Sequence, residues 1–215
     1  MLRLLVVLFA MLTAWPGRSW AEEAGCSGCG APQRDAASFK SSLLVTVKNR
    51  AFIAGVEEKA RAQPKPAPGI VHAELAGDIV VVVVEDRKDI SRFVTSGEGQ
   101  RFGLSNQDMM NAGRENLKRK VSRLQIEEHG PVRSLSFEAD YNAALILLPE
   151  IWSAIPNLPA DLVVAVPARD IVAFGDGADP EAVASLRRIA RMPNDGYPVT
   201  SLLLQRVRGR WMVKN

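Results

Sequence analysis

The sequence predicts an α+β fold: a single domain in which a mixed, largely antiparallel sheet has three or four helices packed on it. One observation is the run Ile79–Val84, whose β-branched composition and short length are typical of a buried strand. A second observation is that pairs of strand patterns around short turns alternate with single helical patterns. A doubly wound parallel sheet would instead need regular strand–helix–strand spacing, which this sequence lacks.

The composition is that of an ordinary globular domain, with 215 residues of which 47% are hydrophobic and 24% are charged. Residues 1–21 contain two of the 27 basic residues and no acid, so 27 − 2 = 25 basic and 24 acidic residues follow them. This near balance gives no electrostatic argument for binding nucleic acid, and we predict no nucleic-acid partner.

Residues 1–21 have the pattern of a signal peptide. Arg3 precedes the apolar stretch Leu4–Ala14, and Ser19 and Ala21 supply the small residues of a cleavage site. The apolar stretch is shorter than the roughly 20 residues that span a bilayer, and no later segment reaches that length. We therefore predict a periplasmic or secreted protein with no transmembrane segment after signal cleavage.

The only cysteines, Cys26 and Cys29, lie in residues 22–37, a flexible lead-in rich in glycine, alanine and charge. Because export implies an oxidising compartment, the simplest prediction is a local disulfide. Free thiols remain an alternative, as does acylation of Cys26, although Glu23 stands where a lipoprotein signal has an aliphatic residue. Gly30 replaces the histidine of a haem-attachment motif, and two thiols are too few for zinc. We predict no cofactor.

The first helix is predicted to begin at Ser38 and to carry an apolar stripe as far as Ala60. A proline-rich stretch then ends it, because proline lacks the N–H that a helix interior needs. Residues 38–69 are therefore predicted to form an N-terminal helix and an extended linker, and residues 70–215 to form the α+β domain.

Within this domain, Asp78–Glu85 is predicted to be a buried strand and Ile90–Thr95 a weaker returning strand. Ser105 begins a helix, because Asp108 can complete a capping box with it. Apolar residues then recur at steps of three and four as far as Leu124, so one face of this helix is predicted to be buried.

Leu124–Glu128 and Val132–Glu138 flank a His-Gly-Pro turn and are predicted to form a hairpin. Asp140 can cap the next helical pattern. Pro149 lies too deep in that pattern to be a first-turn residue, so we expect a kink or two short helices there.

The apolar run Leu162–Val166 is predicted to be a strand buried on both faces, and Ile171–Phe174 is predicted to continue as a strand after a Pro-Ala-Arg-Asp corner. Asp179, with the proline that follows it, is a strong helix start. Val199–Val207 and Trp211–Val213 are predicted to form the last hairpin.

Four short segments stand in the order of a known family. They are Leu104–Leu117, Asp140–Ala144, Val164–Ile171 and Tyr197–Leu202. Together these segments resemble the YtpQ-like family, bacterial proteins catalogued as a domain of unknown function, over roughly residues 78–213. The resemblance implies no established reaction, substrate or cofactor. Asn142 and Ala144 stand where the family commonly has an acid and a hydroxyl.

No motif of a familiar catalytic class is visible. His72 lies beside the linker and His129 in a turn, and a serine hydrolase elbow of the form Gly-x-Ser-x-Gly does not occur. The sequence also lacks a His-Glu-x-x-His zinc motif and a phosphate-binding glycine-lysine loop. Gly97–Gly103 has only two glycines of a dinucleotide fingerprint. We therefore predict no catalytic and no metal-binding residue.

One polar set lies at the ends of predicted elements and at the margins of apolar faces: Asn116, Tyr141, Arg169, Asp170, Thr200 and Ser201. In the structural interpretation, these side chains pair with one another or with buried backbone groups. In the functional interpretation, they converge on a pocket at one edge of the sheet.

Arg169 and Asp170 follow the most buried strand, where an unpaired charge is costly. We therefore expect each to be paired, Arg169 with Asp170 or a nearby carboxylate. If that pair is buried, Arg169→Ala should destabilise the protein by roughly 3 kcal/mol.

These observations favour an exported, non-catalytic binding or interaction module with a protein or small-molecule partner. The alternative is an enzyme with a polar pocket around Arg169, Asp170 and Tyr141. A cavity lined by these side chains with unpaired polar groups would favour the enzyme, and a fully paired, dry cluster would favour the binding module.

Overall fold

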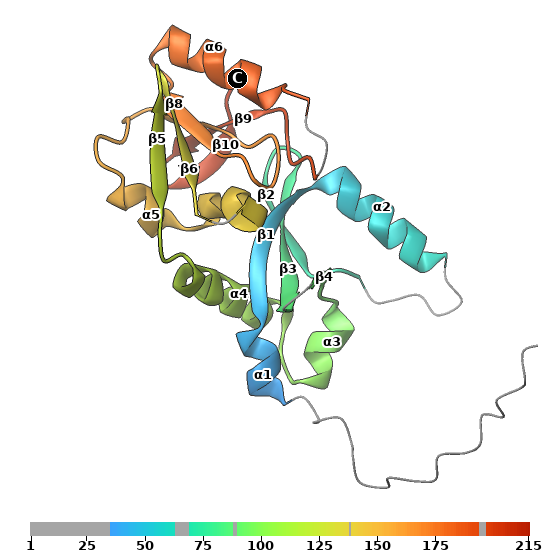
Figure 1. Cartoon of the computed structure of the whole chain (residues 1–215). Coiled ribbons are helices and arrows are strands. Elements are labelled where there is room, and N and C mark those ends of the chain that lie inside the picture. Colours follow the sequence, from blue (N-terminus) through green and yellow to red (C-terminus); the bar gives the residue numbers. More distant parts are fainter. Residues whose placement is uncertain (1–34, 63–68, 88–89, 138, 194–196) are drawn as a thin grey trace, which may run out of the picture. The chain divides into compact units, whose positions relative to one another are not determined.

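The computed structural model describes residues 35–62, 69–87, 90–137, 139–193 and 197–215 (Figure 1). These residues belong to one compact unit, Arg34–Asn215. The predicted signal peptide, the lead-in as far as residue 34 and the predicted Cys26–Cys29 disulfide lie outside the described residues. Among the described helices, none combines the length and the apolar composition needed to cross a bilayer.

The α+β fold is confirmed, and its strands are divided between two sheets instead of one. The first sheet has the order β1-β3-β2, with β4 also paired to β3. Its strands are β1 (Leu43–Asn49), β2 (His72–Ala76), β3 (Ile79–Arg87) and β4 (Ile90–Phe93). β3 pairs antiparallel with each of the other three strands, so it is the centre of this sheet.

The second sheet has six strands in the order β10-β9-β7-β8-β6-β5, and its neighbours are antiparallel. The strands are β5 (Gln125–His129), β6 (Val132–Ser136), β7 (Leu162–Ala165), β8 (Ala173–Asp176), β9 (Leu203–Val207) and β10 (Arg210–Val213). The predicted hairpins β5–β6 and β9–β10 are confirmed. β8 begins two residues later than predicted, at the position where Ala173 pairs with Ala165.

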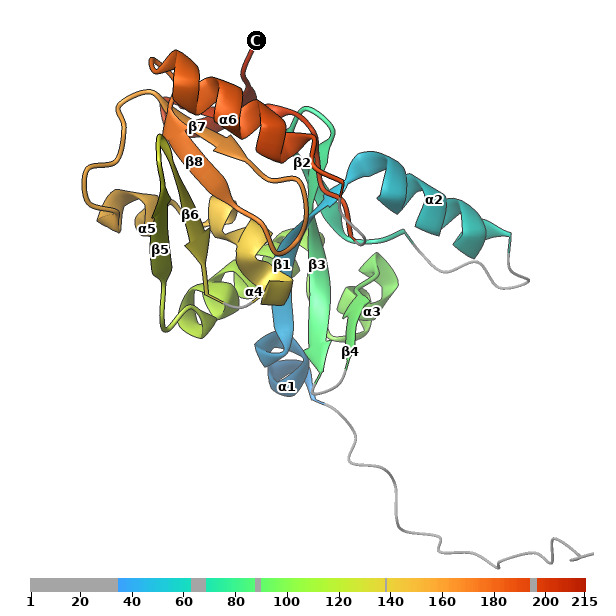
Figure 2. The same ribbon diagram turned by 45° about the horizontal axis from the view of Figure 1, so that its top comes forward.

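The helices are α1 (Ala36–Ser41), α2 (Arg50–Arg61), α3 (Ser96–Arg101), α4 (Asn106–Lys120), α5 (Pro149–Ala154) and α6 (Pro180–Ala190), with the 3₁₀ helix η1 (Ala139–Leu147). The capping box of Ser105 and Asp108 begins α4, and Asp179 caps α6, as predicted. Pro149 stands at the start of α5, directly after η1, so the expectation of two short helices is confirmed. α6 packs on β7 and β8, and α2 projects from the first sheet (Figure 2).

The single helix predicted from Ser38 to Ala60 is wrong. α1 ends at Ser41, and β1 forms before α2 begins. Leu43 and Val47 have a helical spacing, but Leu43–Val47 is buried throughout and pairs residue by residue with β3. Strand pairing and burial on both faces therefore override the local helical pattern. The start of α1 also differs, because Asp35 is its cap and accepts a hydrogen bond from the Ser38 N–H at 2.7 Å.

One large core joins residues of both sheets, including Val45 and Val83 of the first sheet and Phe174 and Leu204 of the second. Trp152 lies within this core, and its ring meets those of Phe174 and Trp211 edge-on, each at 5.5 Å between centroids. The opposite face of the second sheet is covered by α6, where Val163 and Ala165 of β7 pack with Leu186. β7 is thus buried on both faces, as predicted.

Gly113 of α4 allows this helix to approach β1 closely. A Cβ atom at Gly113 would lie 2.9 Å from the carbonyl carbon of Leu44, whereas a Cβ at Gly55 of α2 would have no neighbour within 4 Å. We expect Gly113→Ala to destabilise the protein by about 2 kcal/mol, because backbone must move. The control Gly55→Ala should leave stability unchanged or raise it by up to about 1 kcal/mol. The urea denaturation midpoints of the two variants test this. Equal changes in stability for Gly113→Ala and Gly55→Ala would contradict the close contact between α4 and β1.

Candidate functional site

A cleft of about 680 Å³ opens beside the first sheet. It is lined by side chains from β1, β3, β4, α2, α4 and η1 and by two residues of the connecting segments. The lining residues are Thr46, Lys48, Phe52, Val84, Asp86, Arg87, Ser91, Phe93, Lys120, Asp140, Tyr141, Arg169 and Tyr197.

The strand pleat selects which side chains of β1 and β3 reach the cleft. Successive residues of a strand point to opposite faces, and directly paired residues of neighbouring strands share a face. In the register of β1 and β3, Leu44 pairs with Val84, and Thr46 and Lys48 follow at steps of two. Thr46 and Lys48 therefore share the face of Val84 and Asp86, while Val45 and Val47 point to the other side.

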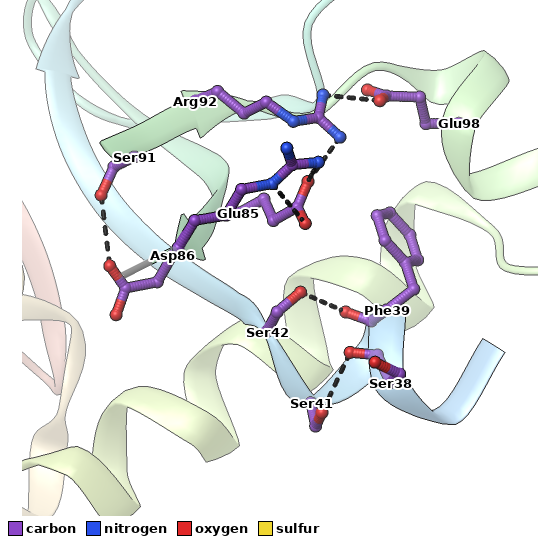
Figure 3. A network of polar contacts seen from close by, with 10 residues as sticks. Ser38, Phe39, Ser41, Ser42, Glu85, Asp86, Ser91, Arg92 and Glu98 are labelled. Carbon is purple, nitrogen blue, oxygen red and sulfur yellow. Dashed lines mark hydrogen bonds and ion pairs between the residues drawn. The ribbon is translucent and has the colours of Figure 1, made fainter. Parts of the chain in front are cut away.

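The neighbouring carboxylates Glu85 and Asp86 of β3 point in different directions (Figure 3). Glu85 is only 1% exposed, and its carboxylate accepts hydrogen bonds from Nε and Nη2 of Arg87 at 3.0 and 3.1 Å and forms an ion pair with Arg92. Arg92 also pairs with Glu98 of α3 at 2.6 Å. This network ties β3, β4 and α3 together.

Glu98 completes the capping box of α3 by accepting hydrogen bonds from the backbone N–H and the hydroxyl of Thr95. Burial opposes the ionisation of this carboxyl. The Thr95 groups and the Arg92 guanidinium outweigh burial, so the pKa of Glu98 is held below its ordinary value. Glu98 is therefore a charged structural anchor for Arg92.

Asp86 is the centre of a second network, at one end of the cleft. Its Oδ1 accepts hydrogen bonds from the Tyr141 hydroxyl at 2.9 Å and from the Ser91 hydroxyl at 3.3 Å, and Ser91 and Tyr141 also bond to each other at 2.8 Å. The Lys120 ammonium lies 3.2 Å from Asp86 Oδ2 and 5.5 Å from the centroid of the Tyr141 ring. This end of the cleft is therefore charged but internally paired.

Lys48 lies at the other end and has a different environment. Its Nζ is 5.2 Å from the ring centroid of Tyr197 and 5.9 Å from that of Phe52. Within the described part of the chain, its ammonium makes no ion pair and no hydrogen bond. Burial lowers the pKa of Lys48 and the charge of Arg169 lowers it further, while Asp140 opposes the shift.

Arg169 connects this end of the cleft to the second sheet. Its guanidinium carbon lies 3.8 Å from the centroid of the Tyr197 ring, and its Nη2 lies 2.9 Å from Oδ1 of Asp140. The Arg169 side chain is 34% exposed and that of Asp140 is 60% exposed. The expected pairing with a nearby carboxylate is therefore confirmed, but the pair is not buried.

Asp170 does not belong to the cleft. It is exposed, and its backbone carbonyl accepts a hydrogen bond from Asn142 at 2.9 Å. Arg169 is among the residues that line the cleft, and Asp170 is not. The predicted enzyme pocket around Arg169, Asp170 and Tyr141 therefore lacks one of its three residues.

Asn116 has a structural role. Its side-chain amide donates to the carbonyls of Lys40 at 2.8 Å, Leu43 at 2.7 Å and Ser41 at 3.2 Å, and Arg119 donates to its oxygen. These contacts satisfy the carbonyls at the end of α1 and the start of β1. Asn116 therefore fastens α4 to the junction between α1 and β1.

Thr200 and Ser201 lie outside the cleft, beside a smaller hollow that Asn49 and Asp78 also line. The Thr200 hydroxyl donates to Asp78 at 2.6 Å and accepts from the Leu202 N–H at 3.0 Å, while Ser201 is exposed. Of the six polar residues predicted from the sequence, the structure brings only Tyr141 and Arg169 together in one cleft.

Sequence analysis missed Lys48, Asp86, Lys120, Asp140 and Tyr197 as members of one site. The signal for Lys48 is present, since Thr46 and Lys48 alternate with Val45 and Val47 as in a strand with two different faces. The helix predicted over this segment concealed that alternation. The other residues are surface-type side chains whose convergence depends on tertiary contacts.

In the described ranges, His, Cys, Asp and Glu side chains do not form a group of three or more that could hold a metal ion. No protein-family model, curated protein or solved structure matches this chain. The resemblance to the YtpQ-like family stays a prediction.

The burial of Asn116 and the partial exposure of Arg169 predict losses of stability of different size. Asn116→Ala should destabilise the protein by about 2 kcal/mol, because several carbonyls lose their donor at a buried junction. Arg169→Ala should cost about 1 kcal/mol or less, because it breaks a solvent-screened ion pair. Denaturant midpoints of the two variants test this order. A larger loss of stability for Arg169→Ala than for Asn116→Ala would instead support the buried ion pair that the sequence predicts.

Proposed function

We propose that this protein is a binding protein whose cleft takes a small organic anion with an aromatic or other apolar body. The observation that carries the proposal is the environment of Lys48. Among the described residues, the other cations of the cleft have carboxylate partners: Lys120 with Asp86, Arg169 with Asp140 and Arg87 with Glu85. Lys48 has none there, and a ligand carboxylate or phosphate would supply the missing charge.

The charge balance of the cleft supports an anionic ligand. Four cations line it (Lys48, Arg87, Lys120 and Arg169) against two acids (Asp86 and Asp140), which gives a formal charge of 4 − 2 = +2. A concave site with an excess of one sign concentrates ligands of the opposite sign. Asp86 and Asp140 are already held by cations, so the excess positive charge is available mainly at Lys48.

Aromatic side chains beside Lys48 support an apolar body on the ligand. Phe52 is 45% exposed and Tyr197 is 52% exposed, although burial of such large aromatic side chains usually stabilises a fold. Phe52 also contacts Phe93, another lining residue, with 6.1 Å between the ring centroids. These rings offer an apolar surface next to an ammonium group, which is a common arrangement in binding sites of small molecules.

Binding is favoured over catalysis because the one extended polar network of the cleft is satisfied internally. This network consists of hydrogen bonds and one ion pair among Asp86, Tyr141, Ser91 and Lys120. Such internal pairing is typical of a structural role. Asp170, which the enzyme hypothesis requires, lies outside the cleft.

Calorimetric titration of three matched probes tests the anion site. Benzoate and phenyl phosphate should bind, while benzyl alcohol, which has the ring but no charge, should not. Lys48→Met should weaken anion binding at least tenfold, about 1.4 kcal/mol. This variant should fold as stably as the parent chain or more stably, because it removes a partly buried cation from between two rings.

Lys59→Met is the matched control, because Lys59 is an exposed residue of α2 outside the cleft. It should leave binding of benzoate and phenyl phosphate unchanged. A higher salt concentration should weaken the binding of benzoate and of phenyl phosphate, since added ions screen the attraction between the anion and the cleft. Equal binding of benzyl alcohol, or equal losses in Lys48→Met and Lys59→Met, would contradict an anion site at Lys48.

Export is part of the same proposal and is supported by the pattern of residues 1–21. Cleavage after Ala21 would release a periplasmic or secreted protein that begins at Glu22, with Cys26 and Cys29 in a local disulfide. The intact mass of the exported form, measured with and without reduction and alkylation, tests both statements. Retention of residues 1–21 in a membrane fraction would contradict export, and alkylation without reductant would contradict the disulfide.

A further inference from the structure

Lys48 and Lys120 line the same cleft but have different surroundings. Lys120 faces a carboxylate, with its Nζ 3.2 Å from Asp86 Oδ2. Lys48 faces the rings of Phe52 and Tyr197 and has no carboxylate within ion-pair distance among the described residues. The two lysines of this cleft thus differ in their surroundings: Lys120 contacts a carboxylate, whereas Lys48 contacts two aromatic rings.

The charged groups around Lys48 favour the neutral amine. Arg169 stacks on the Tyr197 ring, the nearer of the two rings beside Lys48, and adds a like charge nearby. Asp140 opposes this effect, but it is paired with Arg169 and more than half exposed. Asp86 is paired with Lys120, and Arg87 with Glu85. Burial and the Arg169 charge accordingly lower the pKa of Lys48. A desolvated lysine beside another cation is a known way to make an amine nucleophilic.

We propose that Lys48 captures a ligand that carries a carbonyl next to a carboxylate, a 2-oxo acid, by forming a reversible imine. This inference rests on the proposed function, because the ligand carboxylate would occupy the anion site of the cleft. An imine nitrogen no longer offers the ammonium of free Lys48, so the neighbouring cation Arg169, which lies on the same Tyr197 ring, would hold the carboxylate once the imine has formed. The aromatic rim formed by Phe52 and Tyr197 favours a 2-oxo acid with an aromatic side chain.

The step balances without any oxidant or reductant. The Nζ lone pair of Lys48 attacks the carbonyl carbon, and a C–N bond forms as the carbonyl π bond opens to a carbinolamine. The two protons of the amine are transferred to the former carbonyl oxygen, which leaves as water while the C=N double bond forms. Hydrolysis reverses the sequence and releases the ligand unchanged, so the imine is a means of binding and needs no further chemistry.

Reductive trapping tests the proposal on the full chain. The protein is incubated with phenylpyruvate, reduced with sodium borohydride and analysed by intact mass and peptide mapping. We expect a single adduct per chain, located at Lys48, with Lys120 unlabelled as an internal control. The labelling rate should rise as pH rises through the lowered pKa of Lys48. Benzaldehyde, which lacks the carboxylate, should label at least tenfold more slowly.

Two variants separate this proposal from the anion site itself. Lys48→Arg retains a cation but cannot form the imine, so it should still bind benzoate and should lose the adduct. Arg169→Gln should retain Lys48 and lower the labelling rate at least tenfold, with Lys59→Met unchanged as a control.

Benzoate binding without an adduct at Lys48 would overturn the imine and leave the proposed function standing. Adducts scattered over many lysines, or an equal adduct in Lys48→Arg, would also overturn it. An adduct at Lys48 in a protein that binds neither benzoate nor phenyl phosphate would support the imine and refute the anion site.

Discussion

β3 places two adjacent carboxylates on opposite faces of the first sheet, and both the fold and the cleft depend on that separation. Glu85 is buried and forms ion pairs with Arg87 and Arg92. Arg92 in turn pairs with Glu98, so this network holds β4 and the capped start of α3. Asp86 accepts hydrogen bonds from Tyr141 of η1 and Ser91 of β4, and it pairs with Lys120 at the end of α4. Figure 3 shows the two carboxylates diverging, with Glu85 toward Arg92 and Asp86 toward Ser91, so a single step along the strand separates the two networks.

The two ends of the cleft differ in how their charges are satisfied. At Asp86, segments far apart in the chain meet in a closed network, and such networks make a site rigid when every member is paired. At Lys48, the ammonium contacts aromatic rings, and the Arg169–Asp140 pair beside it is exposed to solvent. The cleft therefore joins a paired end at Asp86 to an end where, among the residues that the structure describes, Lys48 has no carboxylate partner.

Much of the fold could be predicted because its signals are local. The apolar run of β3, the capping box of Ser105 and Asp108 and the Asp-Pro start of α6 each act within a few residues. β1 could not be predicted in the same way, because Leu43–Val47 fits a helical stripe until β3 pairs with it. In the site, Tyr141 and Arg169 were visible as polar residues at element ends. Lys48 was concealed by the helix assigned to β1, and Asp86, Lys120 and Tyr197 meet it only through tertiary contacts.

The contrast between Lys48 and Lys120 separates a structural lysine from one suited to binding. A partly buried cation costs free energy, and proteins usually offset that cost with a carboxylate, as Asp86 does for Lys120. Asp140 is close enough to influence Lys48, but it forms its ion pair with Arg169. The cost at Lys48 is reduced instead by two ring faces and by a lowered pKa. Lys48 is thus the cation of the cleft that, among the described residues, has no carboxylate partner of its own.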